Sequence, residues 1–283
     1  MIDGRTRLVG LIGWPVAHSC SPAMHNAAFA ALKLNWSYVP LPVRPEALAA
    51  AVAGLAALGF RGANVTVPHK EAVVPLLDSL SPEAARINAV NTIVVEEDGR
   101  LVGHNTDVAG FIAALRQSGF SPEGRAAVVV GAGGAARAAV HGLLGAGAAR
   151  ILILNRSSAR AEKLISELGT DDRVQALSLT PEALVESAQE ADLLVNATPV
   201  GLWPNAEASI WPTAVPIPAR ITVFDLVYNP VETLLLRQAR EVGARTIPGL
   251  GMLIAQGAAA FRLWTGIDPP LDVMRKAAEE VLS

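Results

Sequence analysis

Short apolar runs alternate with helical patterns along the whole chain. The runs have the length of buried strands, and they are "RLVGLI", "ANVTV", "TIVV", "AAVVVG", "RILIL", "DLLVNAT" and "ITVFDL". Strands that alternate with amphipathic helices are typical of an α/β protein with mainly parallel sheets. The pattern therefore predicts an α/β fold for this chain of 283 residues.

One segment interrupts the parallel pattern. In "VVEEDGRLVG", the turn pair Asp98-Gly99 separates two apolar halves, which predicts a β-hairpin. A helix is expected next, from Asp107 to a stop at Gly119, and a glycine-rich turn follows it. We therefore expect a domain boundary near residue 105. Near the C-terminus, "GLGMLIAQGAAAFRLWTG" predicts a long helix, and a short helix is expected from Pro270.

Several helix starts carry a hydroxyl residue followed by proline. Ser81, Ser121 and Thr180 each precede a Pro-Glu pair, a pattern that predicts a capped helix. Ser21 in "GWPVAHSCSPAMHN" also fits a cap, with a proline suited to the first helical position. Capping does not explain Ser19, which stands two residues earlier in the same link.

The composition excludes several classes of protein. Hydrophobic residues make up 51% and charged residues 17%, which is typical of a globular chain. A net charge of -3 gives no whole-chain basic field for a nucleic acid. The longest uncharged alanine-rich run has 14 residues, too short to span a bilayer. We therefore expect neither a nucleic-acid partner nor a membrane.

The cellular compartment is predicted from one cysteine and from the first residues. Cys20 is the single cysteine, which excludes an internal disulfide and fits a reducing compartment. Arg5 and Arg7 before "LVGLIGWPVA" imitate a signal peptide, but glycine and proline break that segment. A cytoplasmic location is the expectation.

The glycine-rich turn "VVVGAGGAAR" predicts a dinucleotide site. Gly131 allows a tight turn, Gly133 lets the backbone approach a pyrophosphate, and Gly134 helps the next helix to pack on the sheet. The N-terminus of that helix offers N–H groups to phosphates. The form G-x-G-G-x-A is a weak signal by itself, and a glycine-rich packing turn is the alternative. A strand before it and a strand about 20 residues after it favour dinucleotide binding.

The end of the second strand of this unit predicts the type of dinucleotide. An NAD site usually has an acidic residue there, whereas this chain has Asn155, Arg156 and, four residues later, Arg160. Guanidinium groups bind a 2′-phosphate, which an acidic group would repel. The segment favours NADP, with two solvated surface arginines as the alternative.

Polar residues occupy one face of an expected strand in "GANVTVPHKEAV". Alternation places Asn64 and Thr66 on one face and the two valines on the other. Because buried parallel strands are usually apolar on both faces, the polar face indicates a ligand or partner. Lys70 falls at an expected helix start, where the helix dipole would lower its pKa if the side chain is partly buried, and a lysine placed in that way could donate a proton. An ordinary exposed lysine is the alternative.

Two further segments repeat this pattern of polar residues. "INAVNTIV" places Asn88 and Asn91 before a strand, and "GHNTDVAG" places Asn105 and Asp107 at a helix start, where Asp107 could also be a cap. The five histidines show no spacing typical of metal ligands, so no metal site is expected. There is no G-x-S-x-G elbow for acyl chemistry.

Taken together, these segments resemble the shikimate dehydrogenase family, in order and along nearly the whole chain. The matching pieces are "GWPVAHSCSPAMHN", "NVTVPHK", "AVNT", "GHNTD", "GAGGAAR", "NRSSAR", "NATPVGL", "DLVYNP" and "GLGMLIAQ". The resemblance implies an oxidoreductase that reduces 3-dehydroshikimate to shikimate with NADPH, in the pathway to aromatic amino acids. It implies a substrate-binding domain at 1–105, to which 249–283 return, and a Rossmann-type NADP-binding domain at 106–248. We expect a monomer or a homodimer.

The resemblance also implies a role for each site residue. Lys70 and Asp107 match the catalytic pair, in which Lys70 supplies the proton and Asp107 orients it. The residues that match substrate contacts are Ser19 and Ser21 for the carboxylate, Asn64, Thr66, Asn91 and Gln256 for the ring hydroxyls, and Tyr228. The residues that match cofactor contacts are Gly131, Gly133, Gly134, Ala135, Asn155, Arg156, Ser157, Arg160, Thr198, Leu226 and Gly249.

Some positions depart from the family pattern, and two other functions stay open. Ser157 replaces a frequent threonine but keeps the hydroxyl, whereas Pro199 and Leu202 could reshape the nicotinamide edge of the site. One alternative is a quinate-preferring or dual-substrate relative that uses NAD. The other is a non-catalytic NADP-binding sensor, which would not need Lys70 or Asp107.

Overall fold

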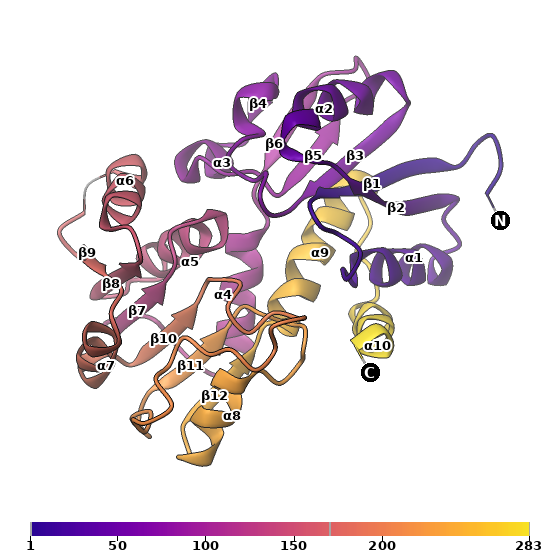
Figure 1. Cartoon of the computed structure of the whole chain (residues 1–283). Coiled ribbons are helices and arrows are strands. Elements are labelled where there is room, and N and C mark those ends of the chain that lie inside the picture. Colours follow the sequence, from indigo (N-terminus) through magenta and orange to yellow (C-terminus); the bar gives the residue numbers. More distant parts are fainter. Residues whose placement is uncertain (1, 170, 283) are drawn as a thin grey trace. The chain divides into compact units, whose positions relative to one another are not determined.

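The apolar runs form two separate sheets, one in each of two units of the chain (Figure 1). The computed structural model describes residues 2–169 and 171–282. The first unit comprises the chain up to Thr106 and again from Ile254 onward, and the second unit comprises Asp107–Leu253. Both units are mixed α/β structures, which confirms the predicted fold class.

The sheet of the first unit is mostly parallel and has the order β2-β1-β3-β5-β6-β4. Its strands are β1 (Arg7–Gly13), β2 (Trp36–Pro42), β3 (Phe60–Val65), β4 (Ser79–Leu80), β5 (Thr92–Val95) and β6 (Leu101–His104). β1 pairs in parallel with β2 and β3, whereas β5 runs antiparallel to β3 and β6. The β5–β6 pair confirms the predicted hairpin, and Gly99 in its turn has a φ of 84°.

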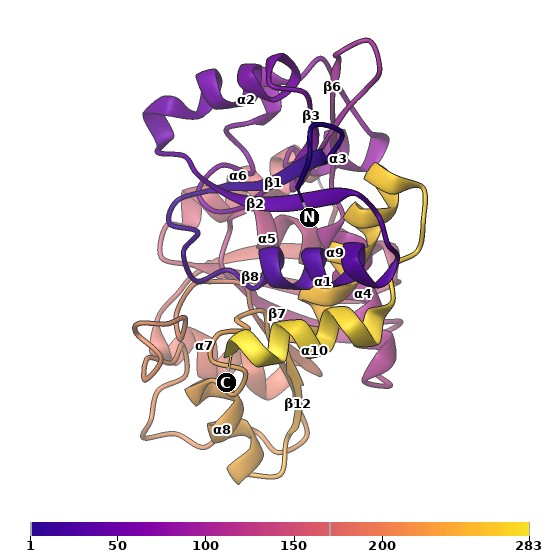
Figure 2. The same ribbon diagram turned by 90° about the vertical axis from the view of Figure 1, so that its right-hand side faces the viewer.

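Helices cover this sheet. They are α1 (Ser21–Ala31), α2 (Leu48–Ala57), α3 (Pro82–Ile87), α10 (Leu271–Leu282), the end of α9 (Leu250–Thr265) and the 3-10 turns η1 (Pro45–Ala47) and η2 (Val74–Leu76). α2 buries Val52 and Leu55 in one core with Ala63 and Ile93 of the sheet. α1 and α10 lie side by side (Figure 2). The C-terminal helices thus return to the first unit.

The sheet of the second unit is parallel at every pair and has the order β12-β11-β10-β7-β8-β9. Its strands are β7 (Ala126–Val130), β8 (Arg150–Asn155), β9 (Val174–Ser178), β10 (Leu193–Asn196), β11 (Thr222–Asp225) and β12 (Arg245–Pro248). Counted along the chain within this unit, the order is 3-2-1-4-5-6, that of a Rossmann fold. Ligands of such sheets bind beyond the carboxyl ends of the strands.

Alternation along β7 explains why both faces of this sheet are covered. Ala127 and Val129 enter one core, while Val128 and Val130 enter another. The helices of this unit are α4 (Asp107–Gln117), α5 (Gly134–Gly145), α6 (Ser158–Leu168), α7 (Pro181–Glu190), α8 (Leu234–Glu241) and the start of α9. α4, α5 and α6 supply the first core, and α7 and α8 supply the second.

Of the three helix starts predicted from a hydroxyl residue before a Pro-Glu pair, one is wrong. Ser81 and Thr180 each accept a hydrogen bond from the backbone N–H three residues later, so both are caps as predicted. Ser121 starts no helix, because the chain turns immediately: Gly124 has a φ of 68° and β7 begins two residues beyond it. A helix needs more residues than this link contains.

Candidate functional site

Ser19 and Ser21 lie in the link between β1 and α1. Ser21 is the first residue of the helix and is buried, and its backbone N–H donates a hydrogen bond of 3.2 Å to Oγ of Ser19. Cys20 occupies the cap position without a side-chain cap. The prediction that Ser21 caps the helix is therefore wrong, because Ser21 is already the first helical residue and the cap position falls on Cys20. The Ser21 hydroxyl is not used as a cap.

A buried polar cluster follows the ends of β3 and β6 and the start of β5. We call it the amide network, and its members are Tyr38, Asn64, Asn91, Thr92, Thr106 and Gln256. The structure thus joins three residues predicted for the substrate, Asn64, Asn91 and Gln256. Nothing in the sequence pattern singled out Tyr38 or Thr92. Gln256 arrives from α9, 165 positions from Asn91 along the chain.

Two backbone groups fix how the amides of this network are turned. The Asn64 amide donates a hydrogen bond of 3.1 Å to the backbone carbonyl oxygen of Asn91, which can only accept. The N–H of Thr106, which can only donate, lies 2.7 Å from Oδ1 of Asn91. The amide nitrogen of Asn91 is therefore left to donate to Oγ1 of Thr106 at 2.9 Å and to Oε1 of Gln256 at 3.2 Å.

Lys70 lies in a turn rather than at the predicted helix start. β3 ends at Val65, and only the 3-10 turn η2, from Val74, is helical in this part of the chain. Prolines at 68 and 75 break the segment, so no helix dipole acts on Lys70. Its backbone carbonyl accepts a hydrogen bond of 2.8 Å from the N–H of Val90, next to Asn91. The lysine is thereby anchored beside the amide network.

Thr66 and Asp107 lie at other strand and helix ends. The N–H of Thr66 donates to the carbonyl of Ile12, so Thr66 and the serine link both follow the carboxyl ends of neighbouring strands. The valine at 67 is 65% exposed although Val65 is buried, so the predicted alternation stops at the strand end. Asp107 is buried at the first position of α4. Asn88 does not lead a strand but ends α3 in a left-handed conformation.

The glycine-rich turn has the form that a phosphate site needs. Gly131 has a φ of 118°, and a Cβ added there would lie 2.9 Å from the carbonyl oxygen of Ala197. Gly133 caps α5 without a side chain, and a Cβ there would meet nothing within 4 Å. Gly134 and Ala135 form the first turn of α5. The turn thus presents a helix N-terminus with open space beside it.

The end of β8 carries cations and no acidic residue. The side-chain amide of Asn155 donates a hydrogen bond of 2.9 Å to the backbone carbonyl of Ser157, which occupies the cap position of α6. Arg156 and Arg160 are exposed at this helix start, and neither is paired with an acidic side chain in the described part of the chain. This arrangement fits the 2′-phosphate of NADP better than the bare ribose of NAD.

A second polar cluster joins the carboxyl ends of β10 and β11. We call it the carboxylate network, and its members are Asn196, Thr198, Asp225 and Thr233. Asp225 accepts hydrogen bonds from Nδ2 of Asn196 at 2.9 Å, from the N–H of Val227 at 3.0 Å and from the hydroxyl of Thr233 at 2.6 Å. Burial raises its pKa to about 6, more than these three bonds lower it.

This network holds together residues that were predicted for the cofactor. Both the N–H and the hydroxyl of Thr198 donate to Oδ1 of Asn196. The N–H of Leu226 donates to the carbonyl of Asn196 at 3.0 Å, and a Cβ on Gly249 would lie 2.5 Å from the carbonyl of Leu226. Tyr228, predicted for the substrate, belongs to the same loop of the second unit. The sequence analysis missed Asp225, although an acid that ends an apolar run was a usable signal.

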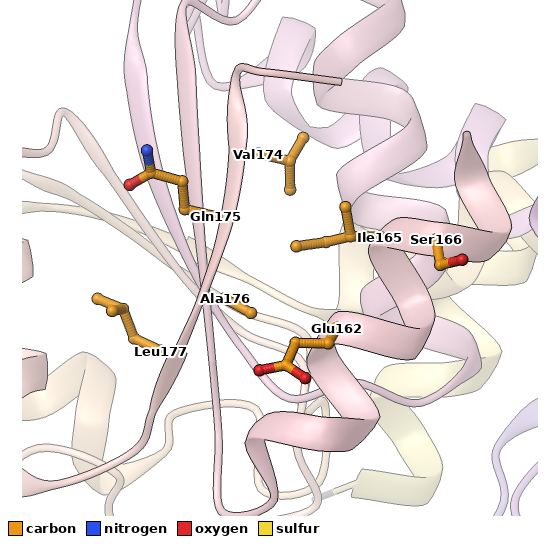
Figure 3. A pocket seen from close by; sticks show the side chains of 7 residues that line it. All are labelled: Glu162, Ile165, Ser166, Val174, Gln175, Ala176 and Leu177. Atoms are coloured by element: carbon orange, nitrogen blue, oxygen red, sulfur yellow. The ribbon is translucent and has the colours of Figure 1, made fainter. Parts of the chain in front are cut away.

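A hollow of about 490 Å³ lies elsewhere in the second unit, between α6 and the edge strand β9 (Figure 3). Its lining residues are Glu162, Ile165, Ser166, Val174, Gln175, Ala176 and Leu177, and none of them was predicted for a site. The residues that line this hollow include no lysine, arginine or histidine that could pair with a phosphate or a carboxylate, and Glu162 would repel either group. Across residues 2–169 and 171–282, no helix has the length and hydropathy of a membrane span.

Known proteins resemble this chain along its whole length. The family profiles that match are the shikimate dehydrogenase substrate binding domain at 11–93, shikimate / quinate 5-dehydrogenase at 114–201 and the shikimate 5′-dehydrogenase C-terminal domain at 249–279. A shikimate dehydrogenase (NADP(+)) of Moorella thermoacetica is 50% identical, over 99% of this chain and 95% of that protein.

Solved structures agree with these matches. Shikimate 5-dehydrogenase from Thermus thermophilus, in complex with NADP(H) and shikimate, is 43% identical with a TM-score of 0.87, over 98% of this chain and 100% of that one. Quinate dehydrogenase from Corynebacterium glutamicum, in complex with NAD, is 32% identical with a TM-score of 0.88, over 97% and 99% of the two chains.

Proposed function

Because the chain belongs to the shikimate dehydrogenase family, we propose that it catalyses the reversible reduction of 3-dehydroshikimate to shikimate with NADPH, in the pathway to aromatic amino acids. The observation that carries this proposal is 50% identity to an NADP(+)-dependent shikimate dehydrogenase over nearly the full length of both chains. The enzyme is thus an oxidoreductase. With Cys20 as its single cysteine, we place it in the reducing cytoplasm.

We assign one role to each unit. The first unit, predicted as 1–105 with 249–283, holds the substrate through Ser19, Ser21, Thr66 and the amide network. The second, predicted as 106–248, holds NADP and contributes Tyr228. In support, the described groups fit the cofactor: open space at Gly133, and two arginines without acidic partners at the start of α6.

Lys70 and Asp107 carry the chemistry in this proposal. NADPH, when bound, supplies the hydride, and the protein supplies placement and a proton. Lys70 donates the proton to the oxygen that becomes the hydroxyl, and its positive charge stabilises the alkoxide as it develops. Asp107 orients Lys70 and accepts a hydrogen bond from the reacting hydroxyl. Ser19 and Ser21 bind the carboxylate beside the N-terminus of α1, which favours an anion.

The test is a spectrophotometric assay of the whole chain. Reduction of NADP⁺ at 340 nm is followed with shikimate and with quinate, and the same pair is then assayed with NAD⁺. We expect the highest kcat/KM with shikimate and NADP⁺. A higher kcat/KM with quinate and NAD⁺ would assign the chain to the quinate-preferring branch, and cofactor binding without turnover would assign it to a sensor.

A further inference from the structure

The hydrogen bonds of Asn64 leave it one way to meet a ligand. Its two amide hydrogens are taken by the carbonyl of Asn91 at 3.1 Å and by Oγ1 of Thr92 at 3.0 Å. Its oxygen accepts one bond, of 2.9 Å, from the Tyr38 hydroxyl. One lone pair of that oxygen remains, so a ligand hydroxyl must donate to Asn64.

The same reasoning shows which group donates and which accepts in the hydrogen bonds farther along the amide network. Because Oγ1 of Thr92 accepts from Asn64, its own proton is free to reach Oδ1 of Asn91, at 3.1 Å. Asn91 in turn donates to Oε1 of Gln256. The amide of Gln256 therefore turns its oxygen toward Asn91 and its nitrogen, a donor, away from Asn91. A ligand at Asn64 is therefore met by an acceptor.

Tyr38 is held where its hydroxyl can reach only a small region. Its ring is 2% exposed and stacks on the buried imidazole of His25, with the centroids 4.5 Å apart and the planes 3° from parallel. Trp264 packs against both rings, with centroids 6.1 Å from Tyr38 and 5.5 Å from His25. A ring that is fixed on two sides carries its hydroxyl as a rigid donor.

We propose that Tyr38 is a positioning residue for the substrate: its hydroxyl holds the Asn64 oxygen in the direction from which a ring hydroxyl donates to it. The inference rests on the proposed function, in which Asn64 binds the ring. It extends that function to a strand, β2, none of whose residues was predicted for the site. The hydroxyl acts through Asn64 and does not touch the ligand.

The experiment removes this hydroxyl alone. Tyr38→Phe keeps the ring and its stack on His25, but it leaves the Asn64 oxygen without its buried donor. Loss of one such bond should raise KM for shikimate by about 5- to 10-fold. We expect kcat within about 2-fold of the wild-type value and an unchanged KM for NADP⁺, because the change is confined to substrate placement. A merely structural role would instead reduce the active fraction, and so kcat, at constant KM.

A double-mutant cycle and a matched control complete the test. In an Asn64→Ala background, Tyr38→Phe should raise KM no further, because its effect passes through Asn64. Trp211→Phe deletes a buried aromatic donor outside the amide network and outside the aromatic cluster that holds Tyr38, namely the indole N–H that bonds the carbonyl of Val215 at 2.7 Å. This control should lower the thermal midpoint and leave KM unchanged.

Each outcome decides the matter. Three results would overturn the inference: an unchanged KM in Tyr38→Phe, an equal KM increase in both backgrounds, or a Tyr38→Phe protein that fails to fold. In each case the proposed function still stands if the wild-type chain is active on shikimate. A wild-type chain with no activity on shikimate would overturn the proposed function itself, and the inference with it.

Discussion

The two units bury polar clusters of different chemistry. The amide network of the first unit consists of neutral side chains that donate hydrogen bonds to one another and accept them from one another. The carboxylate network of the second unit gathers its donors around one acid, Asp225. In the proposed function, the first arrangement presents oriented hydrogen-bonding groups to the ring of the substrate, whereas the second fastens loops together.

Burial acts on a titratable group in each unit, in opposite directions. It raises the pKa of Asp225 to about 6 and lowers the pKa of His25, beside the amide network, to about 3. In both cases the low-dielectric interior disfavours the charged form. Neither ring nitrogen of His25 has a hydrogen-bond partner among the described residues, so nothing offsets its burial.

The largest effect should come from Lys70. Lys70→Ala removes the proposed proton donor and should lower kcat by ~10²–10⁴-fold, the range for a lost general acid, while the dissociation constant of NADPH stays the same. Lys276→Ala, an exposed lysine on α10 of the same unit, is the control and should retain full activity. Steady-state kinetics and a fluorescence titration with NADPH measure the two quantities. Near-normal turnover would remove Lys70 from the mechanism.

Much of this fold could be predicted because strand-like runs and turn residues are local signals. Five of the twelve strands in the described residues were not predicted as apolar runs: β2, β4, β9 and β12 were missed, and β6 was predicted only as half of a hairpin. The strand β2 shows why. Its sequence, "WSYVPLP", contains two prolines and no clean alternation, so it resembles a loop. It becomes a strand because it pairs with β1 at every position from Arg7 to Gly13. The local sequence does not reveal tertiary pairing of this kind.

The residues of the candidate site likewise fall into those that could be predicted from local sequence and those that could not. Asn64 and Asn91 could be found because a polar residue beside a buried strand is anomalous. Tyr38 could not, because a tyrosine in an ambiguous segment carries no such signal. Asn196 and Asp225 are direct partners in the register of β10 and β11, 29 residues apart in the chain, and only the strand order reveals this.

The next largest effects are in stability against pH. From pH 7 to pH 4, His25 should destabilise the fold by about 3 kcal/mol, because the unfolded imidazole takes up a proton that the folded one refuses. Asp225 should stabilise it by about 2 kcal/mol over the same range, because the folded carboxyl is protonated first. The two groups therefore oppose each other in the wild-type protein.

Replacing one group at a time should expose the other. Asp225→Asn, which resembles the protonated acid, should lose more stability on acidification than the wild type, and His25→Phe should lose less. Urea unfolding at pH 4 and pH 7 measures the free energy of unfolding for each variant. Parallel changes in all three proteins would show that neither group titrates as its burial implies.

A smaller effect should separate the two cofactors. Arg156→Ala removes a cation at the start of α6 and should weaken NADPH by about 10- to 30-fold, the worth of a charge-assisted bond to phosphate. NADH, which lacks the 2′-phosphate, should lose little. Arg150→Ala is the matched control, since Arg150 is an exposed arginine of the same unit that pairs with Glu190 at 3.2 Å. Equal losses for both cofactors would make Arg156 structural.

The smallest effects should come from two glycines of one turn, and they separate fold from binding within the second unit. Gly131→Ser places a side chain at a φ of 118° and against the carbonyl of Ala197, so it should destabilise the protein by about 1–2 kcal/mol. Gly133→Ser has open space in the structure, an extended backbone and a residue type preferred at a helix cap, so the free energy of unfolding should stay level or rise. Its hydroxymethyl group would nevertheless occupy the approach of the pyrophosphate and should weaken NADP by about 10-fold. Urea unfolding and NADPH titration of both variants provide the comparison, and a Gly133→Ser protein with unchanged NADPH affinity would mean that the cofactor does not approach this turn.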